Sequence, residues 1–346
     1  MTHAQDVTDR LTAWLRDEVG THVRIEGLES VEFGHSAELL AFAVITARND
    51  SESCRDVVLR MRPPPPALLE PYDLDRQFRV LSALAGSAVR APSVCWYEPT
   101  GEILGRPFFV MDRVDGTVYE LEAPEAISER GERMCRSMIE QLAAVHTVDV
   151  AAVGLADLAD GASHLTRELE HWTAERHRVQ AAPLPALDRL RAELERAAPS
   201  PFPLVTLVHG DAKPGNFAFA DDEVSAVFDW EMTTLGDPLT DLGWLELLWM
   251  QPVGLASHPG APAIDDLLAH YTAVSGITPQ HRPWYRALAA YKMAVICLIG
   301  SMLYAAGHST DERYALNAYG IPMITKLGLS ELGVTEALDD GPVLAR

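Results

Sequence analysis

Two short segments carry side chains whose types and spacing suit phosphoryl transfer. In residues 207–216, Asp211 lies two residues after His209 and five residues before Asn216. In residues 227–231, Asp229 follows directly after a short apolar run. Phosphoryl transfer needs a carboxylate that orients the acceptor hydroxyl, and oxygen ligands that hold Mg²⁺. We therefore predict that Asp211 is the base and that Asn216 and Asp229 are the metal ligands.

Four further polar residues near these segments have predicted supporting roles. His209 is expected to brace its loop through hydrogen bonds, because one loop needs only one base. Lys213 either contacts the γ-phosphate or lies exposed, and the sequence leaves both open. Asp237 and Asp241 are expected to be structural, as a helix cap and a loop brace.

A glycine- and serine-containing turn precedes the apolar run at 39–47. Gly34, His35 and Ser36 lie between two segments with strand character. Backbone N–H groups and a hydroxyl in such a turn can approach phosphates, although a glycine and a serine are also typical of an ordinary turn. We predict that these three residues contact the nucleotide.

Residues 56–61 are predicted to form a strand that carries Arg60. In kinases the corresponding strand carries a lysine for the phosphates, and arginine offers a planar fork in place of that point charge. A helix predicted over 74–84 places Gln77 inward, where it could hydrogen-bond to Arg60 but not form an ion pair. Asp75 is the other candidate partner, and a solvated strand-end arginine is the alternative.

Segments 91–97 and 107–114 are predicted to be two more strands, and the second runs into the turn at Asp115 and Gly116. We place the boundary between an N-terminal nucleotide-binding lobe (1–112) and a C-terminal catalytic lobe (113–346) there. The linker is expected to contact adenine through Met111, Asp112 and Val114. An edge strand before a turn would give the same pattern.

Helical periodicity dominates the rest of the chain. It predicts helices over 7–19, 127–146, 164–179 and 187–197, the last exposed because charged residues occupy most of its faces. Residues 287–307 are apolar enough to cross a membrane, but Lys292 within the run favours a core helix.

Composition limits the possible partners. The chain has 346 residues and a formal net charge of −22, which argues against nucleic acid and anionic membranes as partners. The charge is compatible with a cationic substrate, or it only maintains solubility. The four cysteines form no C-x-x-C pair, and residues 1–10 contain no apolar signal core. We expect a cytoplasmic monomer or homodimer without zinc or disulfides.

Three motifs together resemble the aminoglycoside phosphotransferase family. They are His-Gly-Asp-x-x-x-x-Asn at 209–216, Phe-Asp-Trp-Glu at 228–231 and Leu-Gly-Asp-Pro-Leu-x-Asp-Leu at 235–242. The chain is most similar to the branch of kinase-like domains fused to acyl-CoA dehydrogenases, which segments 58–60, 75–81, 105–111 and 187–190 also resemble.

The resemblance covers most of the chain and implies an α+β, protein-kinase-like two-lobe fold with a small, mainly β N-terminal lobe and a larger, mainly α C-terminal lobe. It also implies ATP, Mg²⁺ and a small hydroxylated acceptor. It assigns Asp211 as catalytic base, with Asn216 and Asp229 as metal ligands. The family's phosphate-binding lysine and its glutamate partner are not matched, because Arg60 and Gln77 stand there.

The acceptor is expected to lie between the catalytic loop and the C-terminal helices. Carboxylates would suit an aminoglycoside, tryptophans a macrolide, and a basic patch a hydroxyacyl thioester. The candidate lining residues, each with a core-packing alternative, are Trp172, Glu175, Glu231, Trp249 and Tyr291.

Three functions fit these features. The first is an active ATP-dependent O-phosphotransferase, which with an aminoglycoside or macrolide acceptor would confer antibiotic resistance. The second is a nucleotide-binding pseudokinase with a sensor or scaffold role, suggested by Arg60 and Gln77. The third is a metal hydrolase that uses His209, Asp211 and Asp229, and it gives the 34–36 turn no role.

Overall fold

The computed structural model describes residues 3–20, 22–31, 37–48, 51–126, 128–159, 163–180, 182–200, 202–251 and 253–335. The chain divides into two compact units. The N-terminal unit comprises Met1–Gly116 and Ser225–Glu231, and the C-terminal unit comprises Thr117–Val224 and Met232–Arg346. Residues 225–231 join the first unit through long-range pairing, since the Val227 N–H donates to the Arg90 carbonyl at 2.7 Å. The predicted lobe boundary at residue 112 stays a prediction.

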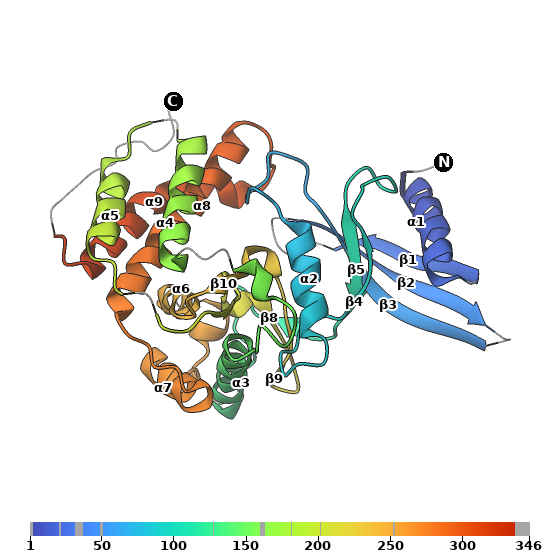
Figure 1. Cartoon of the computed structure of the whole chain (residues 1–346), viewed down its shortest axis with the longest axis horizontal. Helices are drawn as coiled ribbons and strands as arrows, with labels where there is room; N and C mark the ends of the chain where they lie inside the picture. The colour runs from blue at the N-terminus through green and yellow to red at the C-terminus, as the bar shows by residue number, and fades with distance from the viewer. Residues whose placement is uncertain are drawn as a thin grey trace. The chain divides into compact units, whose positions relative to one another are not determined.

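The N-terminal unit is built around one antiparallel sheet with the strand order β1-β2-β3-β5-β4 (Figure 1). In β2 and β3 the register runs from Glu38 opposite Met61 to Arg48 opposite Ser51. The elements of this unit are α1 (His3–Val19), β1 (His22–Ser30), β2 (Glu38–Arg48), β3 (Ser51–Met61), α2 (Leu74–Leu84), β4 (Val94–Glu98) and β5 (Phe108–Asp112).

Helices α1 and α2 contact side chains from two successive positions of β5. Phe108 packs edge to face against Trp14 of α1, with 4.9 Å between ring centroids. The next residue, Phe109, packs at a tilt against Phe78 of α2. Successive side chains of a strand point to opposite faces, so the sheet buries one face against each helix.

The C-terminal unit is mainly helical and contains two small sheets. β10 pairs antiparallel with β7, and the other sheet has the order β6-β8-β9. β9 and η3 extend across the boundary between the units. The elements are β6 (Thr117–Val118), α3 (Ser128–His146), η1 (Ala156–Leu158), α4 (His164–Val179), α5 (Pro185–Arg196), β7 (Thr206–Val208), η2 (Pro214–Asn216), β8 (Phe217–Ala220), β9 (Glu223–Val227), η3 (Trp230–Met232), β10 (Thr234–Gly236), α6 (Leu239–Trp249), η4 (Gly254–Ser257), α7 (Ile264–Ser275), α8 (Arg282–Ala305) and α9 (Glu312–Glu331).

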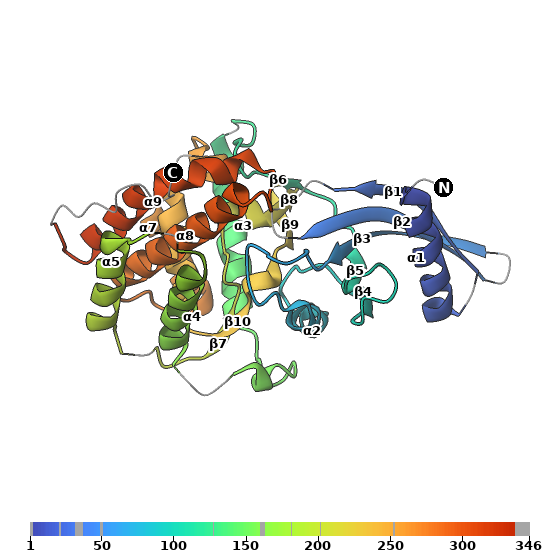
Figure 2. The same cartoon turned by 90° about the horizontal axis from the view of Figure 1, so that it is seen from above.

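Helix α8 forms the core of this unit, with α9 packed along it and α4 and α6 against it (Figures 1 and 2). Within the described part of the chain it is the one helix long and apolar enough to cross a membrane, and 78% of its most apolar window is buried. That burial is typical of a core helix. Gly243 allows the close approach of α6, because a Cβ there would lie 2.6 Å from the Tyr285 backbone.

The prediction that the helix over 187–197 is exposed is wrong for one face of α5. Leu187, Leu190 and Leu194 are fully buried. They form a narrow stripe at helical spacing, and Leu190 lies against Gly328 of α9. Charged residues cover the remaining faces, and this obscured the stripe in the sequence.

Gly243→Ala should lower the free energy of unfolding by about 1–3 kcal/mol, because the added methyl has no room between α6 and α8. Gly320→Ala in α9 is the matched control, since its Cβ would meet only Ile324 Cδ1 at 3.6 Å. Because alanine has a higher helix propensity than glycine, Gly320→Ala should instead raise the free energy of unfolding by up to about 1 kcal/mol. Urea denaturation measures both, and equal stability of Gly243→Ala and wild type would contradict the close packing.

Candidate active site

The loop between β7 and β8 carries the predicted base. It leaves β7 at Val208 and enters η2 at Pro214. Gly210 lies in the left-handed region with φ +86°, and a Cβ there would lie 2.2 Å from the Met232 carbonyl oxygen. Only glycine fits such a turn beside another backbone segment.

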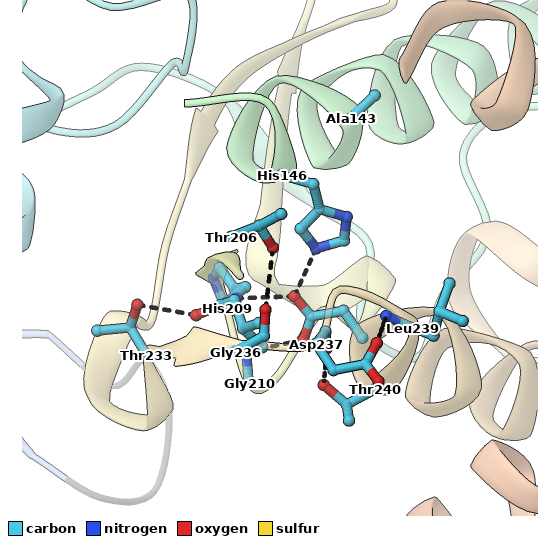
Figure 3. A network of polar contacts seen from close by, with 12 residues as sticks. Ala143, His146, Thr206, His209, Gly210, Thr233, Gly236, Asp237, Leu239 and Thr240 are labelled. Atoms are coloured by element: carbon cyan, nitrogen blue, oxygen red, sulfur yellow. Dashed lines mark hydrogen bonds and ion pairs between the residues drawn. The ribbon is translucent and has the colours of Figure 1, made fainter. Parts of the chain in front are cut away.

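A single buried carboxylate, that of Asp241 in α6, braces this loop. Its Oδ2 accepts the His209 N–H at 2.7 Å and its Oδ1 accepts the Gly210 N–H at 2.8 Å. Oδ2 also contacts His146 Nε2 at 3.0 Å, and His146 Nδ1 is 2.7 Å from the Tyr271 hydroxyl. Figure 3 shows His146, His209 and Gly210 gathered in this network. Asp241 therefore has the loop-bracing contacts predicted for it.

The electrostatics of the brace favour the ionised carboxylate. Burial alone would raise the pKa of Asp241. The hydrogen bond from His146 and the interactions with His209 outweigh burial and hold that pKa below its ordinary value. Hydrogen bonds to the charged form of an acid always act in this direction.

Asp237 has a second structural role at the start of α6. Its Oδ1 accepts the Leu239 N–H at 2.9 Å, and its Oδ2 accepts the Tyr285 hydroxyl at 2.7 Å. Burial raises the pKa of this carboxyl despite those hydrogen bonds. Figure 3 shows Asp237 beside Leu239 and Thr240, as expected of a residue that caps the helix start.

The Asp211 carboxylate is 9% exposed and is held at both oxygens. Oδ1 accepts the Trp244 indole N–H at 2.7 Å, and Oδ2 accepts the Asn216 amide at 2.9 Å. The ammonium of Lys213 lies 3.6 Å from Oδ2. The backbone N–H of Asp211 donates to His209 Nδ1 at 3.2 Å, which is the bracing contact expected of that histidine.

The charge of Asp211 is set by these neighbours. Burial alone would raise the pKa of Asp211, but Lys213, His209, Lys292 and the Asn216 hydrogen bond hold it below its ordinary value. The side chain is therefore an oriented anion at neutral pH, which is the form that can accept a proton from a hydroxyl.

The predicted metal ligands lie in different units. Asn216 is buried in the C-terminal unit, where its amide nitrogen donates to the Asp211 backbone carbonyl as well as its carboxylate. Asp229 belongs to the N-terminal unit and has a positive φ of 64°. Within the described residues, no three His, Cys, Asp or Glu side chains are grouped to hold a metal. Carboxylate and amide oxygens are ligand types that Mg²⁺ accepts beside phosphates and waters.

Arg60 is buried in the N-terminal unit and contacts three side chains. Its guanidinium donates to Glu231 at 2.6 Å, to Asp229 at 2.9 Å and to the Tyr72 hydroxyl at 3.1 Å. Burial would lower the pKa of Arg60, but these partners raise it above its ordinary value. The predicted partners are wrong. Gln77 donates to the Asp73 carbonyl and Asp75 is exposed, so the ion pair comes from residues far along the chain.

Met111 and Asp112, two of the predicted adenine-contacting residues, end β5, which lies between β3 and β4 in the sheet, and Val114 follows two residues later. The Asp112 N–H donates to the Ser93 carbonyl at 2.8 Å, and its carboxylate pairs with Arg55 at 2.5 Å. Met111 and Val114 are half-buried. The N–H of Asp112 is therefore already bonded within the sheet. The predicted phosphate-contacting residues Gly34, His35 and Ser36 lie outside the described residues.

Most of the proposed acceptor-lining side chains have partners within the fold. Trp172 is buried and donates to Glu168 at 3.1 Å. Tyr291 is fully buried with its hydroxyl 3.2 Å from Thr173. Glu175 pairs with Arg178 at 2.6 Å. Glu231 pairs with Arg60 as described above, and Trp249 is half-buried at the end of α6. The packing alternative therefore describes Trp172 and Tyr291.

Two residues beside Asp211 were missed by sequence reasoning. Trp244 was not considered, although it lies three residues after Asp241 and so on the same face of α6. Lys292 served only to argue against a membrane span. A lone cation inside a buried apolar helix was the available signal that it has a specific partner.

A model of the phosphotransferase enzyme family, APH, matches residues 31–288. The chain belongs to this family. Rat acyl-CoA dehydrogenase family member 11 is 30% identical over 286 residues, which are 79% of this chain and 37% of the relative. Mouse acyl-CoA dehydrogenase family member 10 is 28% identical over 302 residues, which are 83% and 28% of the two chains. The chain thus spans about a third of the length of the curated relatives it matches.

Solved structures of the family share the fold. A putative aminoglycoside phosphotransferase from Ralstonia eutropha has a TM-score of 0.76 at 24% identity, covering 95% of this chain and 99% of its own. A mutant of APH(4)-Ia, in ternary complex with AMP-PNP and hygromycin B, has a TM-score of 0.61 at 14% identity, covering 92% and 98%. The predicted family and its α+β, protein-kinase-like fold are confirmed.

Asp241→Asn should lower the free energy of unfolding at pH 7 by about 2–3 kcal/mol or more, because one backbone N–H would face an amide N–H and lose its acceptor. The folded pKa of Asp241 is depressed, so its contribution is present above the ordinary aspartate pKa and is lost as pH falls through the depressed value. The difference from wild type should therefore shrink in acid.

Urea denaturation at several pH values measures this difference. Asp17→Asn, at an exposed position of α1, makes the same charge change as a control and should have little effect. A constant difference across the acid range would contradict the assigned ionisation.

Proposed function

We propose that the chain is an ATP- and Mg²⁺-dependent phosphotransferase that phosphorylates a hydroxyl of a small molecule. The observation that supports it most is the Asp211 carboxylate, which is buried, held at both oxygens and kept ionised in the loop that also carries Asn216. This loop belongs to a chain of the phosphotransferase family.

In the proposed reaction Asp211 orients the acceptor hydroxyl and accepts its proton as the phosphoryl group is transferred. The two hydrogen bonds to its oxygens fix the direction of the carboxylate before the acceptor arrives. Such positioning and the electrostatic stabilisation of phosphate charge supply most of the catalysis in phosphoryl transfer.

Asn216 and Asp229 are the proposed ligands of Mg²⁺. When bound, the ion neutralises charge on the transferring phosphates. Arg60 is proposed to contact the phosphates, and Tyr72 and Glu231 hold its guanidinium in place. We propose that Gly34, His35, Ser36 and the linker residues Met111, Asp112 and Val114 bind the rest of the nucleotide.

The acceptor class is best approached through charge. A polycationic aminoglycoside needs several uncompensated carboxylates, but Glu175, Glu231 and Glu246 are paired with arginines. An acceptor with few or no positive charges fits better. Relatives named for macrolide phosphotransfer and for acyl-CoA dehydrogenases make macrolides and hydroxyacyl thioesters the first acceptors to test.

We propose a cytoplasmic location, since all four cysteines are free thiols.

A nucleotide-binding pseudokinase is the second candidate. It is favoured by the arginine in place of the lysine, and by the engagement of that arginine with Asp229, a proposed metal ligand. Nucleotide binding without turnover on any acceptor would establish it.

Asp211→Asn should reduce phosphoryl transfer from γ-labelled ATP by about 10²–10⁴-fold, because the residue can no longer accept a proton. The acceptors are an aminoglycoside, a macrolide and a hydroxyacyl thioester, and nucleotide binding by calorimetry should stay near the wild-type value. Transfer that persists in Asp211→Asn would refute the assigned base. Phosphate release without any acceptor would instead favour the metal hydrolase.

Arg60→Met should weaken ATP binding by about 10- to 100-fold, because a charge-assisted hydrogen bond to phosphate is worth about 1.5–3 kcal/mol. Arg24→Met in β1 removes an exposed, paired arginine of the same unit and should leave the Kd unchanged. Calorimetric titration with ATP and Mg²⁺ compares the two. Equal Kd values would show that Arg60 is only a structural ion-pair partner.

A further inference from the structure

Lys292 is a buried cation that the proposed reaction does not use. It lies in the middle of α8, is 8% exposed, and its ammonium donates to the carbonyl of Gly210 in the catalytic loop. The ammonium also lies over two indole rings, 4.7 Å from the Trp244 centroid and 5.5 Å from the Trp172 centroid. Burying an ammonium group is unfavourable in free energy unless acceptors or aromatic rings stabilise its charge. A buried lysine with such partners is therefore a candidate for a specific role.

Trp244 connects this cation to the proposed base. Its ring stands over the ammonium of Lys292, and its Nε1–H donates to Asp211 Oδ1 at 2.7 Å. The indole is 4% exposed, so no water competes freely for that hydrogen bond. One side chain thus packs on the cation with its face and donates to the base with its edge.

We propose that Trp244 and Lys292 are a pair of positioning residues that set the direction of the Asp211 carboxylate for proton acceptance. The inference rests on the proposed function and deepens it. Neither residue needs to touch the acceptor or the nucleotide for this role.

The geometry of the loop explains why two residues are needed. The Gly210 N–H is held by Asp241 of α6, and its carbonyl is held by Lys292 of α8. Both ends of that residue are therefore fixed to core helices. The following side chain, Asp211, is then oriented by Trp244, which cannot rotate away because its ring is packed on the Lys292 ammonium. Backbone position and carboxylate direction are controlled separately.

The charges around the pair are balanced. Lys292 faces the carboxylate of Glu168 in α4, and a small cavity under the loop is lined by both together with His164, Asp241 and Trp244. Asp211 itself faces Lys213 and His209 of its own loop, Asn216 of η2, Trp244 of α6 and Lys292 of α8. Removing the Trp244 N–H leaves Asp211 Oδ1 without its indole donor, so the carboxylate loses one of the contacts that fix its direction.

The first experiment does not depend on activity. Protein labelled with [¹³Cγ]aspartate is compared by NMR at pH 7, with the Asp211 signal assigned from Asp211→Asn. The Asp211 carboxylate signal should shift in Trp244→Phe relative to wild type, because its indole donor is removed. In [¹⁵N]tryptophan protein, the Trp244 indole signal should shift in Asp211→Asn.

The second experiment measures kinetics with whichever acceptor is phosphorylated. Trp244→Phe replaces the indole with an aromatic ring that has no N–H donor, and it should lower kcat about tenfold, the effect of losing one hydrogen bond. The acceptor KM should change little. Lys292→Met should also lower kcat, with the same small effect on KM.

Trp284→Phe is the matched control. It removes another buried indole N–H, which donates to the Leu194 carbonyl at 3.0 Å and not to the catalytic loop. It should change neither the Asp211 carboxylate signal nor kcat. If Trp244→Phe behaves like Trp284→Phe in both experiments, the positioning role is overturned, whether or not Lys292→Met folds. If wild type phosphorylates no acceptor, the proposed function fails, and the Asp211 carboxylate signal still decides whether Trp244 holds Asp211.

Discussion

The contacts of the Asp241 carboxylate hold the catalytic loop together. It accepts the backbone N–H groups of His209 and Gly210 and is itself held by His146. An unpaired carboxylate at this depth would be strongly unfavourable, and so would two unpaired backbone donors. The carboxylate and the two backbone donors satisfy one another, and His146 adds a further contact to the carboxylate. The loop is therefore held in one position against α6. The backbone of Asp211, which follows directly, is fixed with it.

Charge compensation within each unit shapes the rest of the site. The chain has a formal net charge of −22, yet the carboxylates near the predicted site have cationic or hydrogen-bonding partners. In the N-terminal unit, Arg60 forms ion pairs with both Asp229 and Glu231. In the C-terminal unit, Lys292 faces Glu168 and donates to the loop carbonyl of Gly210. These buried cations hold acidic groups and the loop backbone in place, and the paired carboxylates are less available for a cationic ligand.

The sequence predicted those structural features whose determining residues lie close together in the chain. The α2 and α4 helices were predicted with their observed bounds, since a single apolar periodicity defines each. The spacing in residues 207–216 assigned Asp211 and Asn216 to one short loop, and the Asn216 amide donates to the Asp211 carboxylate. The exposure of α5 was misjudged because a stripe of three leucines is hard to recognise among charged neighbours.

The sequence by itself determined the family, the fold class and the residue types of the catalytic loop, because these are encoded in short, contiguous motifs. Only the tertiary structure decided which side chains compensate one another. The partners of Arg60 come from residues 229 and 231 rather than from α2, and the neighbours of Asp211 include Trp244 and Lys292 from two core helices. Partner choice among buried charges depends on distances and desolvation. Residues far apart in the chain meet those conditions only once the helices have packed.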